Sequence, residues 1–247
     1  MPETKTAAVG LGRALLTSRS LQASELLGVL IVGACTISCG LAIFGDDTVA
    51  SIGSVWVANL LMLAVIYAGL RFRGQTWKHL GLYLGPPDMK SIVSAVLKSL
   101  PVFALAIVAF AAGAVLMANL VGMPESADMS KYDYLQGNLG MTLLALASVY
   151  VVSSFAEEVI YRGFLITRIQ ELLENRKLAA SFAVVLSSLI FGLVHSDWGW
   201  AGMVQASCMG LALGTSYLIV KRNLWVTILA HAYMDTILIL QMYFSPG

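Results

Sequence analysis

Runs of about twenty apolar residues recur along this chain, and they constrain its fold more than any other feature. A helix of about that length is needed to cross the hydrocarbon of a bilayer. Inside hydrocarbon every backbone N–H and C=O needs a partner within the protein, which over runs this long requires helix. The seven runs lie at residues 26–44, 52–70, 99–121, 139–160, 178–195, 201–220 and 224–244. The sequence therefore predicts an all-α, polytopic transmembrane bundle of about seven to eight spans.

The composition supports this class and excludes others. Only 12% of the 247 residues are charged and 58% are hydrophobic, whereas about 25% of the residues of a soluble domain are charged. A net charge of +1, with no basic stripe between aromatic residues, argues against a nucleic-acid partner. No internal repeat is evident, so we expect a single integral-membrane domain, residues 1–247, in contact with lipid. The sequence leaves the oligomeric state open.

The distribution of Lys and Arg predicts the orientation, because short cytoplasmic loops carry the excess of these residues. An N-terminus in the cytoplasm would place every basic residue except Lys131 on the inner side. We therefore predict this orientation, in a bacterial cytoplasmic membrane. The inner residues would be Lys5, Arg13, Arg19, Arg71, Arg73, Lys78, Lys90, Lys98, Arg162, Arg168, Arg176, Lys177, Lys221 and Arg222, and the acidic outer residues Asp46, Asp47, Glu125, Asp128 and Asp133.

Two adjacent carboxylates and an arginine interrupt the fourth apolar run, in the stretch 155–164. An ionisable group in hydrocarbon is costly, so it indicates a functional site by default. Glu158 and Arg162 are four residues apart and share a face of a helix, where they can pair. Glu157 points about a hundred degrees away and has no such partner. The pattern predicts a structural Glu158, held by Arg162, and a Glu157 that is free for chemistry.

Histidines supply the other candidate groups. His195 ends the fifth run, and His231 and Asp235 lie four apart on one face of the seventh. Taken singly, each of these residues is at least as well explained by a structural role. Polar groups in lipid must face each other or a wet cavity, however, so we expect them to converge with the glutamates. His79, in the loop 71–91, is predicted to be solvated.

Such a cluster permits two kinds of chemistry. A glutamate near histidines can deprotonate a water while the histidines donate to an oxyanion. The same side chains are also good Zn²⁺ ligands, and a zinc-bound water ionises near neutral pH. The sequence contains no HExxH motif, so a zinc site would have to be assembled from separate helices, and no serine lies in a GxSxG setting.

Three motifs in this order resemble those of the CPBP family of intramembrane proteases, which includes CAAX prenyl endopeptidases and the bacteriocin-processing or immunity proteins called Abi. The motifs are Glu157-Glu158-x-x-x-Arg162, Phe191-x-x-x-His195 and His231-x-x-x-Asp235. The resemblance covers about residues 139–240, and it implies that these residues form the catalytic core of an endopeptidase acting on a membrane-associated peptide or protein.

The resemblance also implies roles for the residues. Glu157 would activate water together with His195, and His231 with Asp235 would stabilise the oxyanion or complete a metal site. In the metal version the Zn²⁺ ligands would come from Glu157, His195, His231 and Asp235. Many relatives carry Asn where this chain has Asp235. Ionised Asp cannot donate a hydrogen bond, which favours a metal ligand or a residue that orients His231.

One geometric conflict follows from simple alternation of the spans. Residues 139–157 would make about 27 Å of helix, which places Glu157 near the inner face, whereas His195 would lie near the outer face. A longer fourth helix continuing through Arg168, a lower start of the fifth span, or a helix broken around a wet cavity would each remove the conflict. We predict that Glu157, His195 and His231 reach one water or metal.

Two further function classes are compatible with the sequence. A non-catalytic immunity or scaffold protein would bind a bacteriocin or membrane partner, and its function would survive Glu157→Gln. A small transporter would use the carboxylates as a proton relay, although the absence of a repeat argues against it.

Overall fold

The structure, a computed structural model, describes residues 12, 14–45, 47–83, 86, 88–122, 130–174 and 176–245. Over these residues it is helical and has no strand, which confirms the predicted all-α, polytopic bundle. Part of the orientation prediction rests on Lys5, Arg13, Asp46, Glu125 and Asp128, which lie outside the described residues. The orientation, and the division into one domain with a catalytic core at 139–240, stay predictions.

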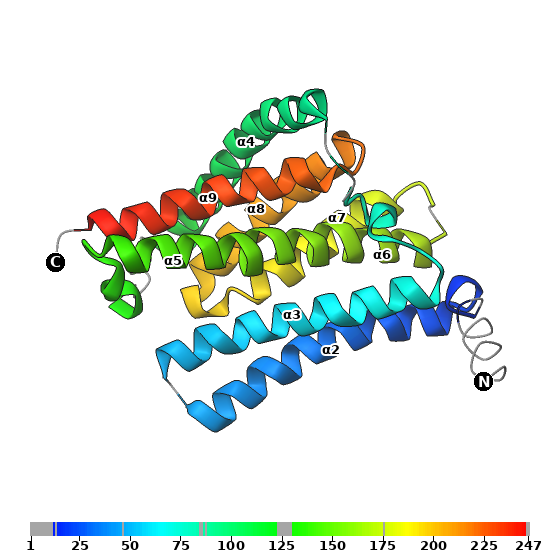
Figure 1. Ribbon diagram of the computed structural model, residues 1–247, viewed down its shortest axis with the longest axis horizontal. Helices are drawn as coiled ribbons and strands as arrows, with labels where there is room; N and C mark the ends of the chain where they lie inside the picture. The colour runs from blue at the N-terminus through cyan, green and yellow to red at the C-terminus, as the bar shows by residue number, and fades with distance from the viewer. Residues whose placement is uncertain are drawn as a thin grey trace.

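The helices follow one another along the chain as Figure 1 shows. Their bounds are α2 Arg19–Phe44, α3 Thr48–Phe72, η1 Trp77–Leu80, α4 Met89–Val121, η2 Ser130–Leu135, α5 Leu139–Val149, η3 Tyr150–Phe155, η4 Glu158–Ile166, α6 Thr167–Leu172, α7 Ala179–Leu193, η5 Ser196–Trp198, α8 Gly199–Ile219 and α9 Leu224–Phe244. The segments η1, η2 and η5 are 3₁₀-helices, while η3 and η4 are π-helices.

Six helices in the described part of the chain are long and apolar enough to cross a membrane. They coincide with six of the seven predicted runs, and the chain is an integral membrane protein. The remaining run, the fifth at residues 178–195, corresponds to α7, which has 15 residues. At 1.5 Å per residue α7 spans about 22 Å, less than the roughly 30 Å of hydrocarbon. The residues that follow α7 therefore need not lie at a membrane surface.

The fourth span is a long helix, because α5, η3, η4 and α6 form one continuous element, Leu139–Leu172. Of the alternatives that the sequence left open, the structure therefore has the one in which this helix continues through Arg168. Its two π-helical stretches flank Ala156 and Glu157. A π-helical turn bonds i to i+5 and often marks a functional position. Apolar periodicity alone did not indicate it.

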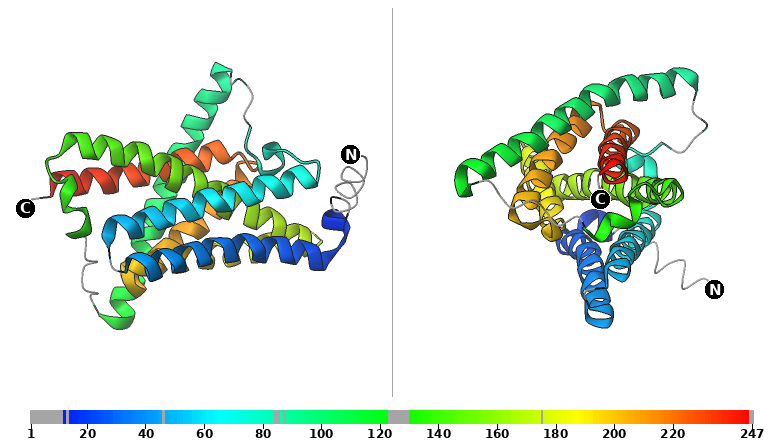
Figure 2. Two further views of the ribbon diagram at one scale, coloured as in Figure 1. Left: turned by 60° about the horizontal axis from the view of Figure 1, so that its bottom comes forward. Right: turned by 90° about the vertical axis from the view of Figure 1, so that its left-hand side faces the viewer.

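The N-terminal hairpin of α2 and α3 lies to one side of the later helices (Figure 2). It packs on the long fourth helix through α3 and, at one end, through α2 against α6. On another side α4 crosses α8 and α9 (Figure 1). The hydrophobic core lies between these layers and includes the fully buried Val159, Phe164, Phe191 and Leu213.

Three segments, the start of α2, the loop after α3 and α6, meet at the end of the bundle where α2 begins and α3 ends (Figure 1). There Arg73 pairs with Glu25. Arg168 Nη1 lies 2.7 Å from Glu171 Oε2, and His79 Nε2 lies 2.9 Å from Glu171 Oε1. We call these five residues the end cluster. His79, predicted to be solvated, is partly exposed and also bonded to a carboxylate.

Two hydrogen bonds join the loop after α3 to the last part of α8 and the first residue of α9. Tyr217 Oη donates to the Leu80 carbonyl at 3.0 Å, and the Leu224 N–H donates to the Gly81 carbonyl at 3.1 Å. Gly81 has a φ of 84°, and a Cβ there would lie 1.8 Å from the Arg222 carbonyl oxygen. Only glycine fits at this contact, which holds the N-terminal hairpin in register with the last two helices.

Candidate active site

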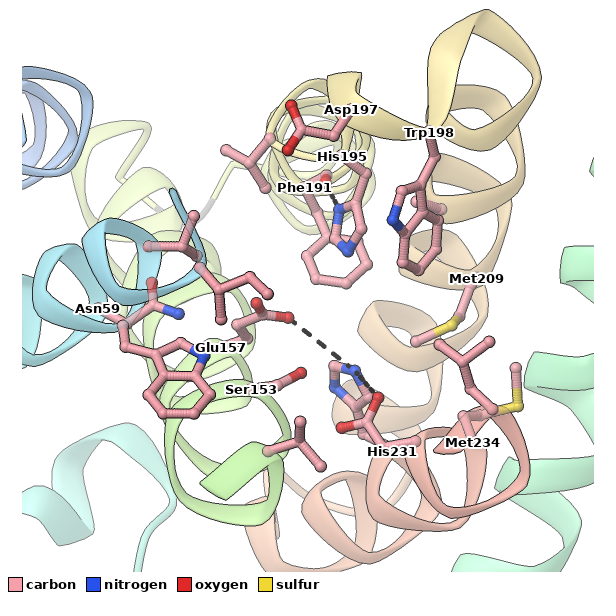
Figure 3. Close-up of a pocket in the computed structure, with 18 of the residues that line it drawn as sticks. Asn59, Ser153, Glu157, Phe191, His195, Asp197, Trp198, Met209, His231 and Met234 are labelled. Atoms are coloured by element: carbon pink, nitrogen blue, oxygen red, sulfur yellow. Dashed lines mark hydrogen bonds and ion pairs between the residues drawn. The ribbon is translucent and has the colours of Figure 1, made fainter. Parts of the chain in front are cut away.

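A cavity of about 940 Å³ lies between the N-terminal hairpin and the C-terminal helices. Its walls are mostly apolar, but Glu157, His195, His231 and Asp235 all line it. Figure 3 shows the first three of these side chains around the cavity, from three different helical segments. The structure thus brings to one cavity the groups that simple alternation of spans had placed on opposite membrane faces. The short α7 and the long fourth helix are the physical reason.

Glu158 and Arg162 form the expected ion pair beneath the cavity. Arg162 Nη1 lies 2.9 Å from Glu158 Oε1, and both side chains are fully buried. The guanidinium also stacks over the Phe191 ring, with Cζ 4.2 Å from the ring centroid, an attractive cation–π contact. Neither residue lines the cavity. Their position agrees with a role in holding the site together.

His231 joins the ion pair to the cavity. Its Nδ1 lies 3.0 Å from Glu158 Oε1, and an ionised carboxylate only accepts, so Nδ1 is the donor. Its Nε2 points the other way, 3.9 Å from Glu157 Oε2 and 3.8 Å from Asp235 Oδ1. Figure 3 draws the first contact as the dashed line between Glu157 and His231. Three carboxylates thus surround one imidazole.

Within the described part of the chain, each of the two adjacent glutamates has a buried oxygen without a hydrogen-bond partner, but of the two it is Glu157 that lines the cavity. Its side chain is buried and lines the cavity, and among the described residues Oε2 has no hydrogen-bond partner. A buried carboxylate oxygen without a donor is costly, and the cavity is where a donor could bind. Water, with two O–H groups, is the simplest donor that fits this position.

His195 lies just beyond α7, and the end of that helix fixes its tautomer. Nδ1 lies 2.7 Å from the Phe191 carbonyl oxygen, which can only accept, so Nδ1 carries a hydrogen. The neutral ring then has its lone pair on Nε2, on the side facing the cavity in Figure 3. Phe191 and Trp198 pack on the ring, with centroids 4.7 and 4.8 Å away. His195 is thus presented to the cavity as an acceptor.

Ser154 is a site residue that the sequence reasoning missed. It is fully buried in η3, and its Oγ donates to Asp235 Oδ2 at 2.6 Å. This bond fixes the Asp235 carboxylate so that its other oxygen faces His231. Four residues separate Asp235 from His231, which indicated their shared face, but a serine in an apolar run gives no comparable signal.

The fit of a metal ion can be judged from the donor side chains. Among the described residues, no group of three or more His, Cys, Asp or Glu side chains is arranged to hold a metal ion. The bonds of Asp235 to Ser154 and of His195 to the Phe191 carbonyl leave Asp235 Oδ1 and His195 Nε2 free, so the arrangement of the donors decides the fit. In this arrangement the residues do not fit a zinc site. Zinc dependence stays a prediction.

Fold and site together define a polytopic helical membrane protein with an acid–histidine cluster facing an intramembrane cavity. A family model described as type II CAAX prenyl endopeptidase Rce1-like matches residues 139–237. This stretch contains all six predicted site residues, and the match confirms the resemblance to the CAAX proteases that the three motifs indicated. Comparison with curated proteins and with solved structures gave no match.

Proposed function

We propose that this chain is an intramembrane endopeptidase that hydrolyses a peptide bond of a membrane-associated peptide or protein. The observation that carries the proposal is the cavity wall shared by Glu157, His195 and His231, with an unsatisfied Glu157 oxygen facing it. The match of residues 139–237 to a family of endopeptidases supports the same reaction.

In the proposed reaction Glu157 is the general base. Its carboxylate takes a proton from a water while the water oxygen bonds to the scissile carbonyl carbon. The lone pair of His195 Nε2 holds the second hydrogen of that water and orients it. When the tetrahedral intermediate collapses, the C–N bond breaks and the proton on Glu157 passes to the leaving amine. Acid and amine products then balance the consumed water.

His231 is proposed to stabilise the oxyanion that forms in this step. In its imidazolium form it donates from Nδ1 to Glu158 and has a second N–H, on Nε2, for the developing charge. Asp235, fixed by Ser154, orients the ring, and Arg162 keeps Glu158 ionised as the acceptor. These assignments use side chains alone, and zinc is not part of them.

The substrate class is proposed from the name of the matched family and from the cavity. CAAX prenyl endopeptidases are named for a prenylated cysteine near a C-terminus. A cavity lined by apolar residues of α2, α3, α4 and α9 would take up such a lipid chain by burial of apolar surface, about 25 cal/mol per Å². We propose a lipid-modified or otherwise strongly apolar C-terminal peptide.

Terminus-selective mass spectrometry tests the proposal directly. Membrane and secreted peptides are compared between cells with the wild-type chain and cells with Glu157→Gln at matched expression. New termini found only with the wild type are the expected result, and they identify the substrate. An unchanged set of termini, with Glu157→Gln still supporting the wild-type phenotype, would overturn the proposal in favour of an immunity or scaffold protein.

A further inference from the structure

A buried carboxamide faces the same cavity from the N-terminal hairpin. Asn59 on α3 is 5% exposed and lines the cavity, where Figure 3 labels it. Its Nδ2 donates to the Val152 carbonyl at 2.8 Å. Val152 precedes Glu157 by five residues on one continuous helix, the spacing of a single π-helical turn. Asn59 is therefore bonded to the backbone one turn from the proposed general base.

Only part of the hydrogen-bonding capacity of Asn59 is used. A carboxamide has two N–H groups and an oxygen that accepts twice. Its bond to Val152 uses one N–H. Because a carbonyl oxygen can only accept, the NH₂ end of the amide must face that helix. Among the described residues, Asn59 Oδ1 has no hydrogen-bond partner. Because the amide borders the cavity, water or a ligand there can complete its bonds, which burial without a partner would make costly.

The chemistry of these unused groups matches a peptide backbone. An extended peptide presents amide N–H groups to an acceptor, and a lipid chain presents none. We propose that Asn59 Oδ1 accepts a hydrogen bond from a backbone N–H of the substrate and so positions the scissile bond against Glu157. Asn59 is a positioning residue, because it acts by placing the substrate and takes no part in proton transfer.

This inference rests on the proposed function and extends it to a part of the chain that the family model does not match. The match begins at residue 139, whereas Asn59 lies on α3. The C-terminal helices would therefore supply the groups that react, and the hairpin would supply the group that sets the register of the peptide.

The experiment measures binding, so that it does not depend on turnover. The full-length Glu157→Gln chain in detergent is titrated with a farnesylated peptide that ends in Cys-aliphatic-aliphatic-Ser. A matched set of peptides has one backbone amide at a time replaced by an ester, which removes a single N–H. The same titrations are made with Glu157→Gln combined with Asn59→Ala.

We expect one ester position to weaken binding to Glu157→Gln by about three- to tenfold, the value of one hydrogen bond. Asn59→Ala should weaken binding of the all-amide peptide by a similar factor and remove the sensitivity to that ester. Asn119→Ala is the matched control, since Asn119 is exposed and its Nδ2 donates to Val115 within its own helix. Asn119→Ala should change neither the affinity for the all-amide peptide nor the loss of affinity caused by the ester.

Two results would overturn the inference. One is an ester penalty that is the same with and without Asn59, which would make Asn59 a structural support for the π-helical turn. The other is no binding of the all-amide peptide. If Asn59→Ala does not fold, the ester-substituted peptides can still be compared on Glu157→Gln. Equal affinity for all of these peptides would contradict the proposed hydrogen bond. Binding with the expected ester pattern but no cleavage by wild type would contradict the proposed function alone.

Discussion

Two clusters of buried charge lie on the same long helix and its neighbours, and they are built differently. In the end cluster two carboxylates, Glu25 and Glu171, meet two arginines, Arg73 and Arg168. None of its residues lines the cavity. The two negative and two positive side chains there balance. A structural role, as a link between α2, α3 and α6, therefore accounts for the cluster.

At the cavity the charges do not balance in this way. Glu157, Glu158 and Asp235 surround His231, with Arg162 paired to one of the three carboxylates. An excess of one charge next to a cavity has to be offset by bound protons or by a ligand. The comparison teaches that burial alone does not distinguish function from structure, whereas charge balance together with access to a cavity does.

The largest expected difference between the clusters comes from the same substitution in each. Glu157→Gln should lower turnover by about 10²- to 10⁴-fold, because the general base is lost, while the isostere leaves the melting temperature near that of wild type. Glu171→Gln should instead lower the stability by about 1 to 3 kcal/mol, since it weakens charge-assisted hydrogen bonds to Arg168 and His79. Turnover per folded molecule should stay unchanged.

Both effects can be measured on purified protein, as peptide cleavage and as thermal unfolding in detergent. Equal losses of turnover in the two variants at equal stability would remove the distinction between the clusters.

We call Glu157, Glu158, Arg162, His231 and Asp235 the cavity cluster. Arg162→Ala tests whether a residue of this cluster behaves like one of the end cluster. The variant leaves Glu158 buried without its cation and removes the stacking on Phe191. Loss of one partner of a buried ion pair costs about 3 to 5 kcal/mol, so we expect little folded protein to accumulate. Size-exclusion chromatography of the solubilised membrane fraction gives this amount. Normal yield with abolished turnover would instead place Arg162 among the reacting groups.

The sequence predicted the parts of this arrangement that follow from spacing along one helix. Glu158 with Arg162, and His231 with Asp235, are four residues apart and lie together as expected. It did not predict Ser154 or the π-helical stretches. A hydroxyl in an apolar helix usually bonds its own backbone, and π-helical turns arise from packing between helices. Neither leaves a periodic signal in the sequence.

Counting spans in the sequence placed Glu157 and His195 near opposite faces of the membrane, whereas in the structure they line the same cavity. Counting apolar residues treats each run as a full crossing, whereas α7 is shorter than a crossing and the fourth helix is longer than one. The bundle fixes these lengths through contacts between segments far apart in the chain. Tyr217 with Leu80 is such a contact.

Ser154→Ala should have a smaller effect, confined to the cavity cluster. The change removes one hydrogen bond to the Asp235 carboxylate, worth about 1.5 to 3 kcal/mol for a charged acceptor, and leaves Asp235 free to rotate away from His231. We expect turnover to fall by about tenfold or more with KM nearly unchanged, because Ser154 does not line the cavity. Ser187→Ala is a matched control, since Ser187 is also buried but donates to the Tyr161 carbonyl. An equal fall in turnover there would mean that the loss is one of general stability.

Removal of metal should have the smallest effect, and it tests the cavity cluster as a whole. Zinc needs three or four donors that converge at about 2 Å from it, and among the described residues no group of three or more His, Cys, Asp or Glu side chains is arranged to hold a metal ion. We therefore expect dialysis against a chelator to leave peptide cleavage within about twofold of the untreated enzyme, since a change that small is under 1 kcal/mol. Loss of cleavage that added Zn²⁺ restores would show that these donors rearrange around a metal. The unbalanced carboxylates at the cavity would then be neutralised by a cation, as the arginines neutralise those of the end cluster.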